Sequence, residues 1–312
     1  MDLKILISGL DNAGKTSILT ALDKKFDFQK EIMELKPTVR VEYNTSTFLS
    51  NRVYYWDMGG QKQYRELYEK NRDTYFAGTD LIVFIIDIQD KNRFDLSLEY
   101  LDLILRYFQD NDMEKVPLIV SFHKFDPQIR DNDDVNDNIN YLRESISKKY
   151  PNFKILFQQT SIYDILSIVQ LVSYGLSVFD EAFFELSTLL EDYLEELGCT
   201  SLILFDHNGI IISEFYSELD PSYYIGLLEN IKEHLFILKR MLEEETNLSA
   251  EDAGNNFISA EDNFLSYLHR IQYKKYNYYI SVIIEEEKKE NLLEKFPDLV
   301  EDILNILKSI FD

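Results

Sequence analysis

The sequence predicts a doubly wound α/β domain followed by a smaller α+β domain. Short apolar segments alternate with helical patterns through the first half of the chain, and one hairpin pattern interrupts them near the start. Such alternation is typical of a mostly parallel sheet that helices cover on both faces. After about Gly175 the patterns change to a helix, a strand pair, a helix, further strands and a last helix. We therefore place the domains at residues 1–175 and 176–312.

Four continuous apolar segments are the predicted central strands of the first domain, because parallel strands are buried on both faces. In chain order they are LKILISGL (3–10), LIVFIID (81–87), PLIVSF (117–122) and KILFQQTS (154–161). The segment VEYNTSTFLSNRVYYWD (41–57) has the alternation of a hairpin that turns near Ser50. A sheet of this kind binds ligands beyond the carboxyl ends of its strands.

The second domain begins with an acidic helical pattern over about 180–197. A strand pair follows, and its junction at Asn208-Gly209 is a strong hairpin signal. Asp220 and Pro221 are expected to begin a long helix, because these residue types favour the first turn. Two or three strands, including FLSYLHRIQ and YNYYISVII, and a C-terminal helix that Pro297 is expected to kink or split complete the prediction.

The composition is that of a folded, acidic protein. Its 312 residues are 45% hydrophobic, and 32 basic against 56 acidic side chains give a formal net charge of -24. This charge argues against binding nucleic acid, although a few local groups can still hold one nucleotide. One cysteine excludes an internal disulfide, and the four histidines lack the spacing of metal ligands. No membrane span, signal peptide or lipid anchor is encoded, so we expect a cytoplasmic protein that a partner can recruit to membranes.

GLDNAGKT (Gly9 to Thr16) matches the phosphate-loop pattern Gly-x4-Gly-Lys-Thr, and it lies between a predicted strand and a helical pattern. In such a loop the backbone N–H groups point at the phosphates, with a helix N-terminus behind them. Lys15 supplies a charge to the β and γ phosphates, and Thr16 supplies a hydroxyl ligand to Mg²⁺. A glycine-rich turn without this function is the weaker alternative.

Two further segments supply groups for the metal and the attacking water. In WDMGGQ (56–61), Asp57 is the predicted second metal ligand, Gly60 offers its N–H to the γ-phosphate, and Gln61 orients water. Thr38 stands just before the hairpin, and its hydroxyl can reach both the metal and the γ-phosphate. The predicted catalytic residues are Gln61, Lys15 and Thr38, and the predicted Mg²⁺ ligands are Thr16, Thr38 and Asp57.

FHKFD (122–126) ends a predicted strand at the edge where the phosphate loop lies. The Asp126 carboxylate can accept two hydrogen bonds from guanine, a donor pair that adenine lacks. Lys124 can lay its aliphatic stem over the base. His123 stands where an asparagine normally bonds both the base and the phosphate-loop backbone, and its single ring N–H can make one of these two bonds. A charged strand end without a ligand is the alternative. The predicted GTP/GDP site comprises Asp11, Asn12, Ala13, Gly14, Lys15, Thr16, Ser17, Thr38, Gly60, His123, Lys124, Asp126, Ser161 and the backbone of Ile162.

These motifs resemble those of two groups of small GTPases. GLDNAGKTS and WDMGGQ resemble the Arf-like proteins, whereas PTVRVE, HKFD, QQTSI and YEKNRDTYF resemble the Rag (Gtr) proteins. The Rag resemblance implies a roadblock/longin-type domain after the GTPase domain, and the element order predicted for the second half is similar to that of such a domain. Asp11, where Rag proteins usually have a small residue, is a departure, and so is the absence of an Arf-type N-terminal amphipathic helix, which argues against a direct membrane anchor.

The expected function is a GTP-binding switch that hydrolyses GTP to GDP with Mg²⁺ and controls partner binding in signalling or trafficking. The resemblance implies exchange, activating and effector proteins as partners, and turnover without an activator on the order of 10⁻⁴ to 10⁻² per second. Two alternatives stay open. One is a scaffold or assembly subunit that holds nucleotide with little hydrolysis, and the other is an ATP-using protein, against which Asp126 argues.

The second domain is expected to pair, as a homodimer or as a heterodimer with a paralogue. Roadblock/longin-type domains commonly pair, and this half of the chain contains no phosphate loop. A surplus of apolar helix residues also indicates an interface. These residues are Leu227, Leu228, Ile231, Leu235, Ile237, Leu238, Met241 and Leu242.

Overall fold

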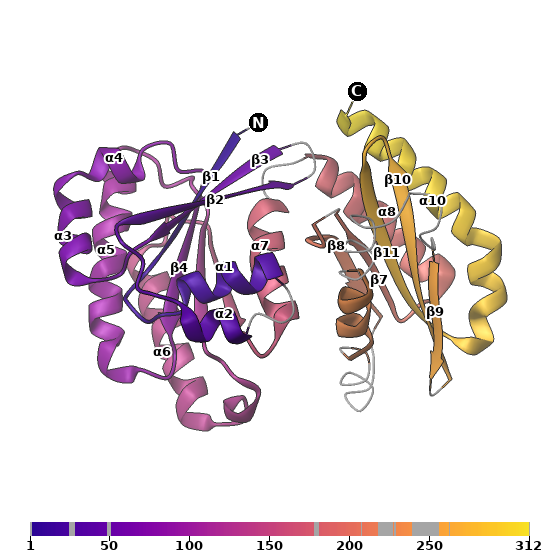
Figure 1. Ribbon diagram of the computed structural model, residues 1–312, viewed down its shortest axis with the longest axis horizontal. Helices are drawn as coiled ribbons and strands as arrows, with labels where there is room; N and C mark the ends of the chain where they lie inside the picture. Colours follow the sequence, from indigo (N-terminus) through magenta and orange to yellow (C-terminus); the bar gives the residue numbers. More distant parts are fainter. Residues whose placement is uncertain are drawn as a thin grey trace. The chain divides into compact units, whose positions relative to one another are not determined.

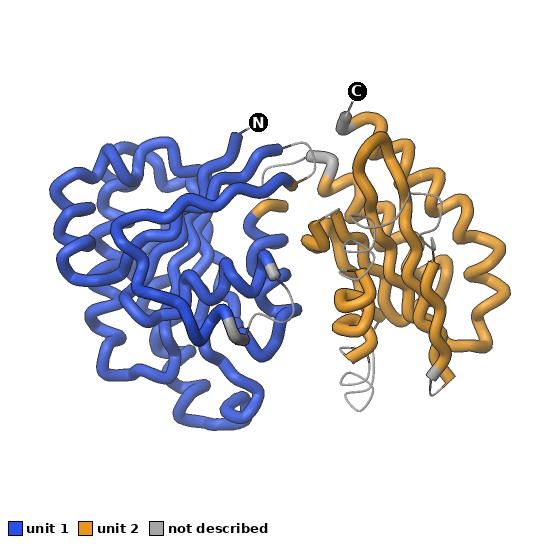
Figure 2. The backbone as a smooth tube through the Cα atoms, viewed as in Figure 1, with its two compact units in different colours: residues 1–47, 51–175 blue, residues 48–50, 176–312 orange. Residues whose placement is uncertain are grey.

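The computed structural model describes most of the chain as two compact units (Figure 2). The described residues are 2–24, 29–48, 51–177, 181–206, 208–217, 227, 229–238, 256–261 and 263–311. Unit 1 comprises residues 1–47 and 51–175, and unit 2 comprises residues 48–50 and 176–312. Each unit contains its own sheet.

Unit 1 is built on a six-stranded sheet in the order β2-β3-β1-β4-β5-β6. Its strands are β1 (Asp2–Gly9), β2 (Val41–Phe48), β3 (Asn51–Met58), β4 (Leu81–Asp87), β5 (Leu118–His123) and β6 (Ile155–Thr160). From β3 to β6 every neighbouring pair is parallel, which confirms the predicted α/β sheet. The predicted hairpin turn at Ser50 lies outside the described residues.

Helices lie on both faces of this sheet (Figure 1). They are α1 (Lys15–Lys24), α2 (Gln29–Glu34), α3 (Lys62–Lys70), α4 (Arg72–Phe76), α5 (Phe94–Asp110), α6 (Asp133–Lys149) and α7 (Ile165–Leu176), with short 3₁₀ turns η1 (Lys91–Arg93) and η2 (Pro127–Ile129). Residues of α3 to α6 share one core with Phe84 of β4 and Phe122 of β5. On the other face α7 approaches the sheet closely, because a Cβ on Gly175 would lie 2.6 Å from Leu81 Cδ2.

The strand register gathers the predicted motifs at one edge of the sheet. Asp87, His123 and Thr160 stand beside one another where β4, β5 and β6 end. Asp57 of β3 pairs with Ile7, two residues before the end of β1. The loops that follow these strands therefore emerge together, at the carboxyl edge where ligands bind in such sheets.

Unit 2 is built on a five-stranded sheet in the order β8-β7-β11-β10-β9, and each neighbouring pair is antiparallel. Its strands are β7 (Ser201–Phe205), β8 (Ile211–Tyr216), β9 (Asn256–Glu261), β10 (Phe264–Tyr273) and β11 (Tyr276–Glu285). Its helices are α8 (Glu181–Leu197) and α10 (Lys289–Phe311), with the 3₁₀ turn η4 (Glu286–Lys288) before α10 and further helical residues at 229–238. Helix α10 is not split at Pro297. The prediction that the second half of the chain combines helices with strands, as an α+β domain, is confirmed.

Helices also cover both faces of the second sheet. Phe296 of α10 packs edge-on against Tyr267 of β10. His234, within the helical residues 229–238, bonds through Nδ1 to Ser281 Oγ at 2.6 Å. Ser281 is opposite Leu268, the neighbour of Tyr267, and successive strand residues face opposite sides of a sheet. Helix α10 and the His234 helix therefore lie on different faces.

The connection between β7 and β8 contains the predicted Asn208-Gly209 turn signal, and the Asp206 N–H donates to the Ile210 carbonyl across it at 2.8 Å. Strand β7 ends at Phe205 and β8 begins at Ile211. The buried Asp206 carboxylate accepts hydrogen bonds from the backbone N–H groups of Asn208 and Ile210, each at 2.8 Å. An aspartate that accepts from loop N–H groups in this way stabilises the turn.

The apolar helix residues expected to form a surplus surface are largely core. Leu227, Ile231, Leu235 and Leu238 are buried, and Ile237 is half-buried. The surplus-surface argument is therefore wrong for these residues. Leu228, Met241 and Leu242, with the expected helix start at Asp220 and Pro221, lie outside the described residues. None of the helices that the structure describes combines the length and apolar character needed to cross a bilayer.

Candidate functional site

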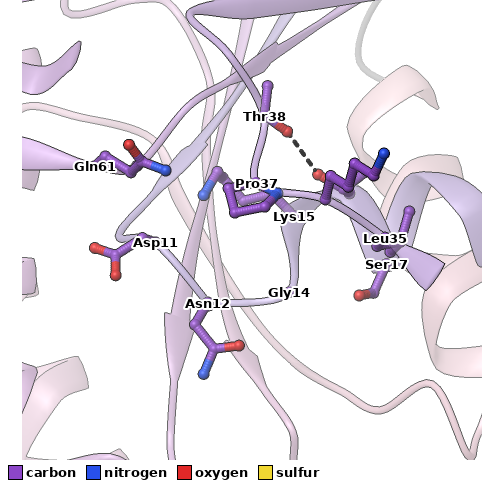
Figure 3. A pocket seen from close by; sticks show the side chains of 12 residues that line it. Asp11, Asn12, Gly14, Lys15, Ser17, Leu35, Pro37, Thr38 and Gln61 are labelled. Carbon is purple, nitrogen blue, oxygen red and sulfur yellow. Dashed lines mark hydrogen bonds between the residues drawn. The ribbon is translucent and has the colours of Figure 1, made fainter. Parts of the chain in front are cut away.

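The loop between β1 and α1 borders a cavity of about 450 Å³ (Figure 3). This volume lies in the usual range for small-molecule sites. The lining residues are Asp11, Asn12, Gly14, Lys15, Thr16, Ser17, Leu35, Lys36, Pro37, Thr38, Gly60 and Gln61. All of them except Leu35, Lys36 and Pro37 were predicted from the sequence. The predicted Ala13 is buried beneath the loop instead of lining the cavity.

Lys15 is the charged group at the start of α1. Its side chain is buried, and its ammonium donates a hydrogen bond to the Leu10 carbonyl at 2.7 Å. Burial lowers the pKa of Lys15 to about 8, while the charges of Asp57 and Asp11 oppose that shift. A polyanion bound at this helix N-terminus would stabilise the protonated, charged form of Lys15, so the position suits a phosphate.

Two of the predicted metal ligands, Thr16 and Thr38, line the cavity, and the third, Asp57, contacts both of them. Thr16 Oγ1 donates to Asp57 Oδ2 at 2.6 Å, and Thr38 Oγ1 lies 3.0 Å from Thr16 Oγ1 and 3.2 Å from Asp57 Oδ2. The Thr16–Thr38 contact is the dashed line at Thr38 in Figure 3. Burial raises the pKa of Asp57, and the hydrogen bond from Thr16 and the charge of Lys15 oppose the rise.

This donor set fits magnesium. Mg²⁺ takes hard oxygen ligands, and it usually binds one or two protein groups together with water and substrate phosphates. The second carboxylate oxygen of Asp57, Oδ1, is buried without a hydrogen-bond partner. Within the described part of the chain, no three His, Cys, Asp or Glu side chains form a metal cluster, so a structural metal site of that kind is not the competing explanation.

The loop after β3 touches the phosphate loop. A Cβ on Gly60 would lie 2.2 Å from the Asp11 backbone nitrogen, so only glycine fits there. Gln61 precedes α3 and lines the cavity beside it. Farther back, the Gly59 N–H donates to the Arg40 carbonyl at 2.6 Å, and the Tyr68 hydroxyl donates to the same carbonyl at 2.6 Å. These bonds tie the segment that carries Thr38 to the segment that carries Gln61.

A second cluster lies where β5 and β6 end. Asp126 Oδ1 accepts from Ser161 Oγ at 2.6 Å, and Asp126 Oδ2 accepts from Gln89 Nε2 at 2.9 Å. Lys124 Nζ pairs with Asp87 Oδ2 at 2.6 Å. The two carboxylate oxygens of Asp126 are thus oriented by side chains from two other strand ends. The predicted Ile162 directly follows Ser161 in this loop.

His123 links the two clusters. Its ring is buried, Nδ1 lies 2.9 Å from Thr160 Oγ1, and a Cβ on Gly14 would lie 2.6 Å from Nε2. Gly14 has a φ of 96°, so both its backbone and its contact with the ring require glycine. Burial, together with the charge of Lys124, lowers the pKa of His123 to about 3, so the imidazole is neutral.

Sequence reasoning missed several residues of this edge. Gln89 and Asp87 come from the end of β4, and Arg93, which pairs with Asp11, comes from η1. The available signal was DIQD after the strand LIVFII, since β4 ends at the same edge as the phosphate loop. Polar residues there had to be near the ligand.

The chain was compared with known protein families and structures. The family described as "Arf: ADP-ribosylation factor family" matches residues 1–164, which is more than half of the chain and ends before residue 176, where the main part of unit 2 begins. The "ADP-ribosylation factor-like protein 3" of Saccharomyces cerevisiae is 32% identical over 148 residues, covering 46% of this chain and 71% of that protein. The "ADP-ribosylation factor-like protein 1" of the same organism is 33% identical over 125 residues, covering 40% of this chain and 62% of that protein, so the match spans less than two thirds of it.

A solved structure is also similar to part of the chain. It is titled "Structure of the Arl6 BBS3 Small GTPase from Trypanosoma brucei with bound nucleotide analogue GppNp". The match has a TM-score of 0.45 and 19% identity, and it covers 57% of this chain and 97% of the other.

Proposed function

The chain belongs to the ADP-ribosylation factor family of small GTPases, and from this premise we propose that it is a guanine-nucleotide switch that hydrolyses GTP to GDP with Mg²⁺. The observation that carries the proposal is that the phosphate-loop cavity and the Asp126 cluster lie at the same edge of the sheet. The cavity with Lys15, Thr16 and Asp57 suits a metal-bound polyphosphate, and the Asp126 cluster suits a base.

In the proposed mechanism the phosphate loop and Lys15 hold the polyphosphate. Thr16, Asp57 and Thr38 hold Mg²⁺, which when bound neutralises charge on the β and γ phosphates. Gln61 lines the cavity and orients the attacking water. Gly60 packs against the phosphate-loop backbone with no room for a side chain, and in this proposal its N–H donates to the γ-phosphate. Among the arginines of these loops, Arg65 donates to the Gly60 carbonyl at 3.1 Å and so supports the loop.

Base selection is assigned to the second cluster. Asp126, oriented by Ser161 and Gln89, accepts from the two guanine N–H groups. Neutral His123 has a single ring N–H, and its position between Thr160 and Gly14 fits a link between base loop and phosphate loop. An adenine base lacks this pair of N–H donors, so the Asp126 carboxylate would gain no hydrogen bonds from it, which supports GTP over ATP.

Switching is assigned to the two segments tied at the Arg40 carbonyl. The γ-phosphate is the ligand that Thr38 and Gly60 share in this proposal, so its loss by hydrolysis removes their common anchor. Exchange, activating and effector proteins are the expected partners of these segments. Intrinsic turnover should be slow, on the order of 10⁻⁴ to 10⁻² per second.

The finer assignment is to a Rag-like protein whose second unit is a roadblock/longin-type pairing domain. What supports it is the element order of unit 2, which follows the order expected from the resemblance: helix, strand pair, helix, three strands and helix. Strand β9 is also an edge strand with Ile258 60% exposed, and edge strands can pair with another chain. Light scattering tests pairing: full-length protein should be dimeric and a fragment ending at Gly175 monomeric, whereas a monomer in both removes the proposal.

The nucleotide assignment is tested by denaturing the purified protein and identifying the released nucleotide by chromatography. Guanine nucleotide supports the proposal, and adenine nucleotide overturns it. Hydrolysis of bound GTP is then measured with and without Mg²⁺ in a single turnover. Bound GTP that is never hydrolysed, with any activator, favours the alternative of a nucleotide-holding scaffold.

A further inference from the structure

Asp11 places a carboxylate in a loop that must receive a polyanion. It lines the cavity, and Figure 3 shows it on the same side as Gln61. A Cβ on Gly60 would lie 2.2 Å from its backbone nitrogen. Asp11 therefore belongs to the part of the loop next to the γ-phosphate position of the proposed function. An uncompensated negative charge there would oppose GTP binding.

Arg93 compensates this charge. Its Nη2 lies 2.6 Å from Asp11 Oδ1, and its Nη1 donates to the Asp11 backbone carbonyl at 3.0 Å. Exposed ion pairs contribute little to stability, and these side chains are 30% and 45% exposed. The fork, however, bonds both the side chain and the main chain of one residue, which fixes geometry as well as charge.

Arg93 acts through Asp11 and is not itself a lining residue of the cavity. Both of its bonds to Asp11 come from guanidinium nitrogen atoms, and its segment η1 follows β4. Asp11 lines the cavity whereas Arg93 does not, so the charge of Arg93 reaches the site through its ion pair with Asp11.

We propose that Arg93 is a positioning residue that sets the preference for GTP over GDP by neutralising Asp11 beside the γ-phosphate. The proposal rests on guanine-nucleotide binding as proposed above. Repulsion from a bare Asp11 falls with distance, so it affects the γ-phosphate more than the β-phosphate. GDP lacks the γ-phosphate and is affected less.

The test compares the affinities of four proteins for GDP and for a non-hydrolysable GTP analogue: wild type, Arg93→Ala, Asp11→Asn and the double variant. Arg93→Ala should lower the analogue-to-GDP affinity ratio by about tenfold, since an uncompensated charge at this range acts on that scale. Asp11→Asn removes the carboxylate that Arg93 neutralises but keeps the backbone carbonyl to which Arg93 donates, and it should raise the ratio. The double variant should restore it.

The matched control is Arg106→Ala. It breaks a comparable ion pair with Asp102, 2.7 Å long, on α5 and away from the cavity lining, and it should leave the ratio unchanged. Equal losses for both nucleotides in Arg93→Ala, or a double variant as impaired as Arg93→Ala, would overturn the proposal. If Arg93→Ala fails to fold, Asp11→Asn decides, because an unchanged or lowered ratio there also overturns it. Wild-type protein that binds neither nucleotide would instead overturn the proposed function together with this inference.

Discussion

Replacing Asp126 by asparagine exchanges one hydrogen-bond acceptor for a donor at the position assigned to guanine. The structure indicates that the fold tolerates this change. The amide oxygen can still accept from Ser161 Oγ, now 2.6 Å from Oδ1. Gln89 loses Asp126 as an acceptor but keeps the Lys124 carbonyl at 2.7 Å. The free energy of unfolding should therefore fall by about 1 kcal/mol or less.

Nucleotide binding should change far more than stability. Guanine would lose one hydrogen bond outright, at about 1.5 to 3 kcal/mol, and the other would lose its charged acceptor, at about 1 to 1.5 kcal/mol. GTP should therefore bind roughly 10² to 10³-fold more weakly to Asp126→Asn. Xanthine has a carbonyl where guanine has its amine. The new amide N–H matches that carbonyl, so xanthosine triphosphate should bind better to the variant than to the wild type.

The assay is competition against a fluorescent guanine nucleotide, with GTP and xanthosine triphosphate as competitors. Asp164→Asn is the control, because it neutralises a carboxylate of the same edge that pairs with Arg130 at 2.7 Å. The control should keep its preference for GTP. Undiminished GTP affinity in Asp126→Asn would refute the assignment of the base site, and equal loss for both nucleotides would refute the hydrogen-bond exchange.

Three further predictions concern the phosphate end. Gln61→Leu should leave GTP affinity within a few-fold while slowing single-turnover hydrolysis, because only the positioning of water is lost; a variant that hydrolyses at the wild-type rate contradicts this role. Burial lowers the pKa of Lys15 to about 8 and bound phosphate holds its proton, so above that pH binding must take up a proton. GDP affinity should be full at pH 7 and fall by up to about tenfold per unit above pH 8, and Lys15→Arg should remove this dependence. Tyr68→Phe removes the donor to the Arg40 carbonyl, so urea unfolding should show a loss of about 1 to 2 kcal/mol, with GTP-analogue affinity reduced more than GDP affinity; unchanged stability would show that this bond contributes nothing.

The parts of the site that sequence alone predicted are those fixed by local spacing. The phosphate loop must follow a strand and begin a helix, so Lys15 and Thr16 could be placed from eight residues of sequence. Asp57 and Asp126 could be placed because each ends a strand with a recognisable pattern. Arg93 and Gln89 could not, because their roles depend on bonds across 82 and 37 residues of chain. An arginine after a strand does not indicate a role by its position alone, and its partner Asp11 can be identified only in the folded structure.

Unit 2 shows a different reason for failure. The periodicity of Ile231, Leu235 and Leu238 predicts an apolar helix face, but it does not distinguish a face that meets a sheet from one that meets another chain. The structure places these residues in the core. The turn after β7 was predicted from Asn208-Gly209, but the role of the Asp206 carboxylate was not. A buried carboxylate that accepts from the N–H groups of Asn208 and Ile210 is a property of the folded loop.

The histidine that replaces asparagine in the base loop has a physical account that involves its neighbour in the phosphate loop. The His123 ring occupies the space that a Cβ on Gly14 would need, so the two positions constrain each other. Because burial keeps the ring neutral at physiological pH, His123 adds no charge next to the loop that Lys15 serves. Its Nδ1 contact with Thr160 fixes the ring orientation, which leaves Nε2 toward the phosphate loop. A neutral, oriented imidazole can therefore take over the bridging part of the asparagine role, while recognition of guanine falls to Asp126.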